Sequence, residues 1–339
     1  MEWRFLTLKR ITIDLPAMRH YFLLFIAAAT LFSCNEALTP EIILEDLQSD
    51  RIKDVVIDSD TYNEMDDQYA IAYALASDRM NVLALHAAPF HNDRSTGFAE
   101  GMELSFKEME RVLEVTGCQG KYPVFKGAEK SVSDDPDQFD PNNPAAQNLV
   151  SIARKARKPV YVLCLGAITN VAAALMLDPS IKGSIVVVWL GTNCFSRGNL
   201  EEFNLYQDYM AGQKVVDSGV PLVILPAMGK RGEGTQVLRV DQEKIQAIQG
   251  EGRAQRFFRS ELPQEFHDTQ GEWRHILWDV AAPGLVAHPE YYRLRVIPAP
   301  ILTDDRQFAF DSTRHRIVWM DSLDPDAVFS DLFSCLSAN

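Results

Sequence analysis

The chain has 339 residues, of which 47% are hydrophobic and 24% are charged. This composition is that of a globular protein, and it excludes a disordered chain, which would lack the apolar residues needed for a core. The net charge is −14 and no cluster of Lys and Arg stands out, so we expect no nucleic-acid partner, because such binding depends on basic side chains that neutralise phosphates. The acidity favours solubility, and bound cations are the alternative explanation.

The N-terminal segment predicts an export signal that is not part of the fold. Residues 21–33 form an apolar run that is too short to span a bilayer and has the length of a signal-peptide core. The basic residue Arg19 precedes this run, and Met18 stands where such a signal would begin. We therefore expect residues 1–17 to be an over-extended gene start and residues 1–33 to be the signal peptide.

The apolar run ends in Leu31-Phe32-Ser33-Cys34, with an apolar residue three positions and a small residue one position before a cysteine. This resembles a lipobox, in which the cysteine receives the lipid. We therefore predict lipidation of Cys34 and a tether over residues 34–50. The protein would then be an exported lipoprotein of a bacterial cell envelope, facing the periplasm or at the surface, and held to the membrane by its lipid anchor only. A plain signal peptide or a buried helix with a chance cysteine is the alternative.

Strands and helices are predicted to alternate through residues 51–339, which we interpret as one domain. Runs of β-branched and apolar residues predict strands, and apolar residues at helical spacing predict helices. The run at 184–190 is almost continuously hydrophobic, as in a strand covered on both faces. In chain order we expect strand 54–57, helix 67–77, strand 82–88, helix 97–116, strand 160–165, helix 170–176, strand 184–190, helix 208–218 and strand 220–225.

This alternation predicts an α/β fold with a mostly parallel, Rossmann-like open sheet and helices on both faces. Residues 134–144 are rich in turn formers and predict a loop. No internal repeat or strong linker divides the domain. The cysteines that follow Cys34 match no metal-site spacing, and the sequence does not determine whether any of them pair. They are Cys118, Cys164, Cys194 and Cys335.

The strongest functional signal is an acidic loop between the first predicted strand and the first predicted helix. Residues 58–67 read Asp-Ser-Asp-Thr-Tyr-Asn-Glu-Met-Asp-Asp. In open α/β sheets, ligands bind beyond the carboxyl ends of the strands. Five carboxylates at one strand end would repel one another without a cation, and a hard divalent ion is their natural partner. Capping of the helix and solvation of the acids are the alternative, although a cap needs only one Asp.

Three further segments follow the acidic loop in chain order. Residues 165–170 read Leu-Gly-Ala-Ile-Thr-Asn, residues 199–204 read Asn-Leu-Glu-Glu-Phe-Asn, and residues 278–282 read Trp-Asp-Val-Ala-Ala. Together with the loop, they resemble the inosine–uridine preferring nucleoside hydrolases over about residues 53–330. The resemblance implies that family's fold, a small ribosyl substrate, and calcium-dependent hydrolysis of the N-glycosidic bond of ribonucleosides to free base and ribose.

The resemblance also implies roles for individual residues. Asp60 would be both a ligand of the calcium ion and the base that accepts a proton from the attacking water. Asn92 is equally compatible with an ordinary turn. The implied calcium ligands are Asp60, Asp67, Asp279 and the backbone carbonyl of Leu165, and the implied substrate contacts are Asp66, Asn92, Asn199, Glu202, Asn204 and Trp278.

The chain departs from the family pattern in two places. Two extra residues precede the Asp66–Asp67 pair, and residues 61–65 replace the usual Pro-Gly segment. Trp278 stands where many members have a histidine that protonates the leaving purine, and an indole can stack on a base but donates no catalytic proton. Three histidines are candidates for the missing acid, with an ordinary surface or core role as the alternative for each: His91, His267 and His275.

The sequence leaves three functions open. The first is nucleoside hydrolysis in the cell envelope, for scavenging. The second keeps the site but acts on a modified nucleoside or another N- or O-ribosyl compound, which the longer loop and Trp278 motivate. The third is a non-catalytic ribosyl-binding lipoprotein, against which the intact set of carboxylates argues. Members of the family are often dimers or tetramers, and the sequence leaves a homo-oligomer open.

Overall fold

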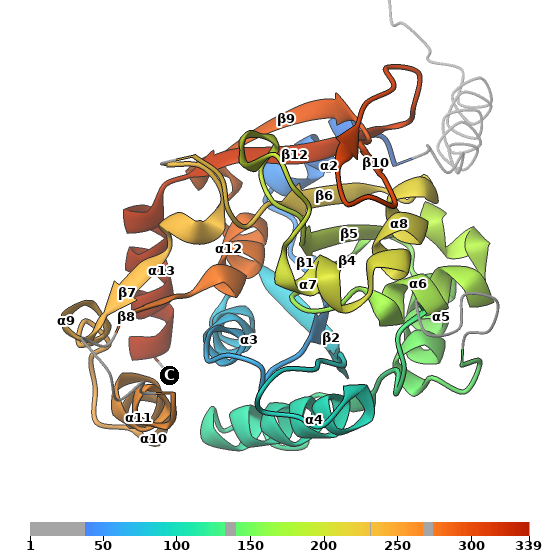
Figure 1. The fold of residues 1–339 in the computed structure, drawn as a ribbon. Coiled ribbons are helices and arrows are strands. Elements are labelled where there is room, and N and C mark those ends of the chain that lie inside the picture. The colour runs from blue at the N-terminus through green and yellow to red at the C-terminus, as the bar shows by residue number, and fades with distance from the viewer. Residues whose placement is uncertain (1–37, 133–139, 231, 267–273, 339) are drawn as a thin grey trace, which may run out of the picture. The chain divides into compact units, whose positions relative to one another are not determined.

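An eight-stranded sheet runs through the structure, a computed structural model that describes residues 38–132, 140–230, 232–266 and 274–338 (Figure 1). The strand order is β3-β2-β1-β4-β5-β6-β12-β9. All neighbouring pairs are parallel except β12 and β9, which are antiparallel. From one edge to the other, the strands are Val124–Lys126, Met80–Ala87, Lys53–Ser59, Val160–Cys164, Ile185–Leu190, Leu222–Leu225, Arg316–Leu323 and Tyr292–Pro298.

Side chains of the parallel strands alternate between two hydrophobic cores, one on each face of the sheet. In β4, Val160 and Val162 belong to one core, whereas Tyr161 and Leu163 belong to the other. Helices α5 (Pro144–Lys155), α6 (Thr169–Leu177) and α8 (Tyr209–Asp217) contribute to the first core. Helices α2 (Pro40–Gln48), α3 (Asp66–Ala76), α4 (Phe98–Val115), α12 (Ala281–Ala287) and α13 (Pro325–Ser337) contribute to the second. Because both faces are covered, the strands are hydrophobic throughout, and the predicted fold class is confirmed.

The helices around the sheet also include α7 (Phe203–Gln207). Three one-turn helices, α9 (Gln242–Ile245), α10 (Arg253–Arg256) and α11 (Leu262–Glu265), lie together at one side of Figure 1. Two strand pairs complete the structure: β7 (Arg239–Asp241) with β8 (Arg274–Ile276), and β10 (Ile301–Leu302) with β11 (Phe308–Ala309).

All nine elements predicted between residues 54 and 225 form, with boundaries within two residues of those expected. Within this range the sequence analysis missed β3, which has only three residues, and the helices α5 and α7. In the predicted loop 134–144, Asn143 caps α5 and Pro144 is the first residue of that helix, while residues 133–139 lie outside the described part of the chain.

The tether predicted for residues 34–50 is wrong in its second half, because Pro40–Gln48 form helix α2. The helix begins with the side chain of Thr39 as its cap. Its apolar residues Ile43 and Leu47, one turn apart, are 1% exposed and belong to the core. The packed domain therefore begins near residue 39. The predicted signal peptide, Met18 and Cys34, which is predicted to be lipidated, lie outside the described residues.

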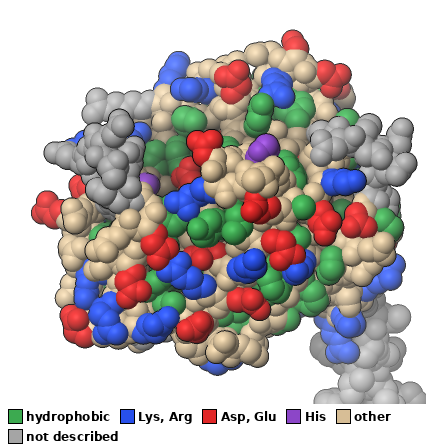
Figure 2. Space-filling model, turned by 60° about the horizontal axis from the view of Figure 1, so that its bottom comes forward, with side chains coloured by type: hydrophobic (Ala, Val, Ile, Leu, Met, Phe, Trp, Pro, Cys, Tyr) green, Lys and Arg blue, Asp and Glu red, His purple; other side chains and the backbone are tan. Residues whose placement is uncertain are grey.

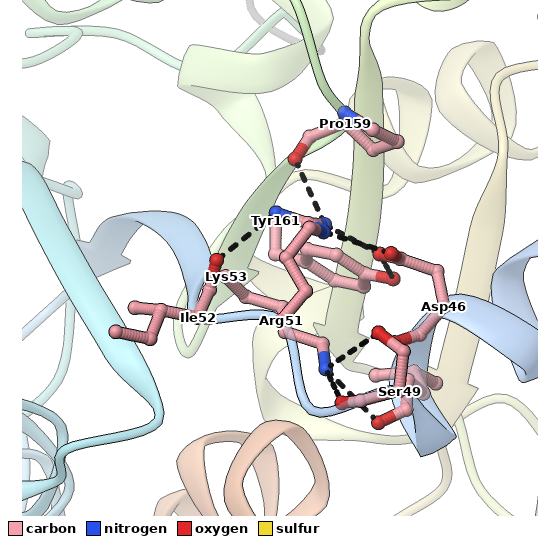
Figure 3. A network of polar contacts seen from close by, with 8 residues as sticks. Asp46, Ser49, Arg51, Ile52, Lys53, Pro159 and Tyr161 are labelled. Carbon is pink, nitrogen blue, oxygen red and sulfur yellow. Dashed lines mark hydrogen bonds and ion pairs between the residues drawn. The ribbon is translucent and has the colours of Figure 1, made fainter.

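Polar contacts fasten the end of α2 beside the start of β1 (Figure 3). The side chain of Lys53 is fully buried, and its Nζ donates a hydrogen bond to the carbonyl oxygen of Ser49 at 2.6 Å. Asp46 accepts hydrogen bonds from Nε of Arg51 at 2.8 Å and from the hydroxyl of Tyr161 in β4 at 2.7 Å. Since buried charged groups are tolerated only when they are paired, these contacts fix where the chain enters the sheet.

The face drawn in Figure 2 carries acidic and basic side chains interspersed with hydrophobic ones. This face therefore presents charges of both signs. Within the described residues, no helix combines the length and the hydrophobicity that crossing a bilayer requires.

We expect Asp46→Ala to lower the free energy of unfolding by about 1–3 kcal/mol, because the buried hydroxyl of Tyr161 and the guanidinium of Arg51 both lose their acceptor. Denaturant unfolding of the purified domain measures this. Asp50→Ala is the matched control, since the side chain of Asp50 is fully exposed and lies 3.5 Å from the guanidinium of Arg79. It should leave the midpoint unchanged, and equal effects of the two substitutions would show that these contacts do not hold α2.

Candidate functional site

The acidic loop lies at the carboxyl edge of the sheet, between the neighbouring strands β1 and β4. The chain order of the strands reverses here, with β2 and β3 on one side of β1 and β4 to β6 on the other. Asp58 pairs with Cys164, and the backbone N–H of Leu165 donates to the carbonyl oxygen of Asp58 at 2.8 Å. Asp60 and Leu165 therefore leave the sheet side by side, where a crevice forms in folds of this kind.

A cavity of about 160 Å³ opens at this edge. Four adjacent strands each supply a lining residue at or just beyond their ends: Asp60, Leu165, Leu190 and Ala227. The cavity is smaller than the roughly 300–1,000 Å³ of pockets that enclose a drug-sized ligand, so it encloses a smaller group. The other lining residues are Asn63, Glu64, Asp66, Glu202, Phe203, Asn204, Met228, Trp278 and Asp279.

Three buried carboxylates face one another beside the cavity. One oxygen each of Asp66, Asp67 and Asp279 lies within 4.8 Å of the other two. Asp67 accepts a hydrogen bond from the hydroxyl of Ser59 at 2.5 Å, and Asp66 accepts one from the backbone N–H of Asp279 at 3.1 Å. The second of these bonds brings the first turn of α3 together with a segment more than 200 residues further along the chain. Such a group of oxygens can hold a metal ion.

Asp60 lies among these groups with one carboxylate oxygen uncommitted. Its side chain is 1% exposed, and its Oδ2 has no hydrogen-bond partner among the described residues. The negative charges of Asp67 and Asp66 both act on it. Gly166 makes room for it, because a Cβ at that position would lie 2.7 Å from Cγ of Asp60. A buried oxygen aimed at no donor is what a cation ligand requires.

Burial is the largest cause of the raised pKa values in the cluster. It raises the pKa of Asp60, Asp66 and Asp279 well above the ordinary value, and the neighbouring carboxylates raise it further. Burial also raises the pKa of Asp67 to about 7, against the opposing hydrogen bond from Ser59. Removing carboxylates from water disfavours their charged forms, and a divalent cation would reverse this. The donor set therefore fits calcium, which binds carboxylate and carbonyl oxygens.

Asp58 belongs to the acidic loop but does not line the cavity. It is fully buried and accepts a hydrogen bond from Nδ2 of Asn170 at 3.0 Å, while Nδ1 of His86 lies 3.7 Å away. Burial raises the pKa of Asp58 to about 7 and lowers that of His86 to about 4, so both side chains are driven toward their neutral forms. Asp58 and His86 therefore pack in the interior beside the acidic loop and do not line the cavity.

Glu202 and Asn204 line the cavity, and both are anchored to the backbone. Glu202 caps α7, accepting hydrogen bonds from the backbone N–H groups of Thr192 at 3.1 Å and Asn204 at 3.0 Å. Burial raises the pKa of Glu202 to about 7. Nδ2 of Asn204 donates to the carbonyl oxygens of Leu165 at 2.7 Å and Leu190 at 2.9 Å, which ties the ends of β4 and β5 together.

Two predicted substrate contacts, Asn92 and Asn199, do not line the cavity. Nδ2 of Asn92 donates to Oδ1 of Asn63 at 2.5 Å, so Asn92 lies one contact behind the cavity wall. Oδ1 of Asn199 accepts a hydrogen bond from Nδ2 of Asn193 at 3.2 Å and belongs to the turn that precedes α7. The remaining predicted residues are brought together at or beside the cavity: Asp60, Asp66, Asp67, Leu165, Glu202, Asn204, Trp278 and Asp279.

The sequence analysis assigned no role to Glu64, although this residue lies in the acidic loop and lines the cavity. Part of its surface is exposed at the mouth, yet surrounding atoms remove enough water from the carboxyl group to raise its pKa. The charge of Arg94 and a hydrogen bond from Trp278 act in the opposite direction. The sequence signal that could have indicated a role for Glu64 was its position two residues before Asp66 in the acidic loop. Among the other lining residues, Met228 carried no local signal, and Phe203 lay within the segment 199–204 but was assigned no role.

No histidine of the described residues lines the cavity. His91 is exposed, and its backbone N–H donates to Gln207 at 2.8 Å. His275 lies in β8, while His267 is outside the described part of the chain. Neither His91 nor His275 is therefore placed to protonate a group bound in the cavity.

Comparisons with known proteins match this chain to one family. The model of the family described as inosine-uridine preferring nucleoside hydrolase matches residues 55–329. Probable uridine nucleosidase 1 of Oryza sativa subsp. japonica is 24% identical over 262 residues, which are 71% of this chain and 78% of that protein. The pyrimidine-specific ribonucleoside hydrolase RihA of Klebsiella pneumoniae subsp. pneumoniae is 27% identical over 195 residues, or 50% of this chain and 58% of that protein. The solved structure of a purine-preferring ribonucleoside hydrolase from Gardnerella vaginalis has a TM-score of 0.63 and 19% identity, with 84% of this chain and 98% of that chain covered.

We expect calcium to raise the melting temperature by an amount that grows from about pH 5 to about pH 8. Carboxyl groups with raised pKa values, such as Asp67 at about 7, stay protonated in the folded metal-free protein, whereas the same groups lose their protons above about pH 4 in the unfolded chain. Their contribution to the free energy of unfolding therefore falls as the pH rises toward 7. Calcium binds the deprotonated carboxylates, so its stabilising effect grows over the same pH range. Thermal unfolding with calcium and with a chelator measures the difference.

Asp67→Asn is the control for that experiment, because it removes one carboxylate of the cluster and should reduce the growth of the difference with pH. A calcium effect of constant size across the pH range in the unsubstituted protein would contradict metal binding by these groups.

Proposed function

The chain belongs to the inosine-uridine preferring nucleoside hydrolase family, and from this premise we propose that it hydrolyses the N-glycosidic bond of ribonucleosides to free base and ribose in a calcium-dependent reaction. The observation that carries the proposal is the meeting of Asp60, Asp66 and Asp279 at the cavity, with Oδ2 of Asp60 uncommitted. The names of similar proteins include uridine, pyrimidine and purine substrates, so we propose the class of ribonucleosides without a particular base.

Hydrolysis of an N-glycosidic bond passes through a ribosyl group with the character of a cation. A water oxygen attacks the anomeric carbon, the bond to nitrogen breaks, and its electron pair leaves with the base. Asp60 accepts a proton from the water at its uncommitted oxygen. The buried carboxylates of Asp66 and Asp279 lie where positive charge develops on the sugar, and fixed charges in a buried site stabilise such a state strongly.

The ribose hydroxyls have acceptors and donors available at the cavity wall. Asp66 and Glu202 provide carboxylate oxygens, and Asn204 provides an amide. Backbone contacts hold each of these side chains, since Asp66 accepts from the N–H of Asp279 and Glu202 caps α7. A sugar bound by side chains that are already fixed loses little further freedom, which favours one reactive orientation.

The metal ligands we propose are Asp60, Asp67, Asp279 and the backbone carbonyl of Leu165. When bound there, calcium would position the water and the ribose hydroxyls and make the water more acidic. The carbonyl of Leu165 is held in place by the hydrogen bond from Asn204. Two observations support a calcium ion at these residues: the buried oxygen of Asp60 lacks a donor, and three carboxylates lie within 4.8 Å of one another.

We also propose that the mature protein is a lipoprotein that acts in the cell envelope in nucleoside scavenging. The proposal rests on the lipobox-like segment that ends at Cys34. Because α2 begins at Pro40, only residues 35–39 would separate the lipid from the domain. A segment of this length reaches at most about 20 Å when extended, so the domain would work close to the membrane surface.

We expect Asp60→Asn to lower kcat by about 10²–10⁴-fold for every nucleoside that the enzyme cleaves, because the amide accepts no proton from water. A chelator should abolish the activity of the unsubstituted enzyme, and added calcium should restore it. Release of reducing sugar from purine and pyrimidine nucleosides measures both effects. Unchanged turnover in the Asp60→Asn enzyme would contradict the assignment of the base.

Gly166→Ala should impair activity as severely as a change at Asp60, because the added methyl group occupies the space of the Asp60 carboxylate. Gly183→Ala is the matched control, since a Cβ there meets nothing within 4 Å. Both variants are assayed for sugar release and for their unfolding midpoint. Full activity in a folded Gly166→Ala enzyme would show that the position of Asp60 does not limit the reaction.

A further inference from the structure

The two departures from the family pattern meet in the structure. Glu64 belongs to the longer loop, and Trp278 stands where many members have a histidine. They are separated by more than 200 residues in the chain, but both line the cavity, where the indole N–H of Trp278 acts as a donor that lowers the pKa of the Glu64 carboxyl group. The extra loop residues and the tryptophan thus form one feature.

The cavity has a buried end and an open end. Asp60, Asp66 and Asp279 are at most 3% exposed, whereas Phe203 is 37% exposed and Glu64 also reaches solvent. A nucleoside has a small polar sugar and a flat base. At about 160 Å³ the cavity suits the sugar at its carboxylate end, which leaves the base at the mouth beside Glu64, Trp278 and Phe203.

Glu64 is close to the sugar end as well as to the mouth. Among neighbouring charges, that of Glu64 acts most strongly on Asp66, one of the residues proposed to bind the ribose. Glu64 thus lies between the proposed ribose contacts and the mouth, which is where the glycosidic bond and the base of a bound nucleoside would lie. Glu64 is nevertheless outside the cluster of three carboxylates within 4.8 Å of one another.

The side chain of Glu64 is positioned and has acceptor capacity to spare. Trp278 contacts it as a donor, and the charge of Arg94 offsets its own. Arg94 is itself held, with its guanidinium 3.8 Å from the ring centroid of Phe266 and its backbone N–H bonded to Asn92 at 2.9 Å. An ionised carboxylate has about four lone-pair positions, and an indole N–H occupies one.

We propose that Glu64, which lines the cavity together with Trp278, is a specificity-determining residue that accepts a hydrogen bond from an N–H group on the edge of the nucleobase. This inference rests on the proposed function, because it names the substrate class of the same cavity. The enzyme then favours nucleosides whose base presents such a donor, and it disfavours bases whose facing edge carries acceptors only, since a carboxylate repels them. A site with a hydrogen-bonding group left unpaired discriminates strongly against such analogues.

The experiment compares inosine, whose base carries a ring N–H, with purine riboside, whose base carries none. The quantity measured is the ratio of their kcat/KM values in the calcium-loaded enzyme. Glu64→Gln keeps the size of the side chain and an oxygen for Trp278, but it replaces the second acceptor with a donor. We expect this variant to lower the ratio by about 10- to 100-fold, as for a lost hydrogen bond to a charged group.

Glu110→Gln is the matched control, because Glu110 is exposed on α4 and does not line the cavity, and it should leave the ratio unchanged. A ratio unchanged by Glu64→Gln would overturn the inference, including the case in which both substrates are cleaved more slowly by the same factor. If the unsubstituted enzyme releases no ribose, the proposed function fails. The inference is then tested by binding, with the dissociation constants of inosine and purine riboside measured by calorimetry for the unsubstituted protein and for Glu64→Gln. A ratio of the two dissociation constants that Glu64→Gln leaves unchanged would overturn the inference.

Discussion

The burial of several carboxylates at one edge of the sheet is the constraint on which the rest of the site depends. Asp60, Asp66, Asp67 and Asp279 are all at most 3% exposed, and burial raises the pKa of each. An arrangement of this kind is unfavourable unless donors or a cation offset it. The protein supplies some donors through Ser59 and the backbone, and it leaves one oxygen of Asp60 without any. That remaining deficit supports both the proposed calcium site and the proposed role of Asp60 as the base.

The parallel sheet supplies the framework that makes this arrangement possible. The ends of β1, β4, β5 and β6 lie along one edge and place one lining residue each at the cavity. Asn204 ties the ends of β4 and β5 together, while Gly166 allows the carboxylate of Asp60 to approach the turn after β4. Residues that would otherwise be assigned to substrate binding alone therefore also maintain the geometry of the site, as the capping of α7 by Glu202 shows.

The two ends of the cavity serve different purposes in the proposed reaction. The buried end carries the carboxylates and the amide that the family resemblance implies. The mouth carries the features in which this chain departs from the family pattern, namely Glu64 and Trp278. Under the proposed function, variation at the mouth would change which leaving group is accepted without altering the charges proposed to stabilise the sugar. This separation would make a common reaction compatible with different bases.

The sequence by itself determined the alternation of strands and helices and the presence of the acidic loop, whereas the family resemblance made Asp60, Asp67 and Asp279 candidate metal ligands. The alternation and the acidic loop have local signals, because periodicity and clusters of charge are written in neighbouring residues. Only the tertiary structure decided that α2 packs into the core, because Asp46 and Tyr161, which hold it, are 115 residues apart. It also decided that Asn199 lies outside the cavity and that Glu64 meets Trp278. Contacts of this kind depend on strand order and loop paths, which no local pattern encodes.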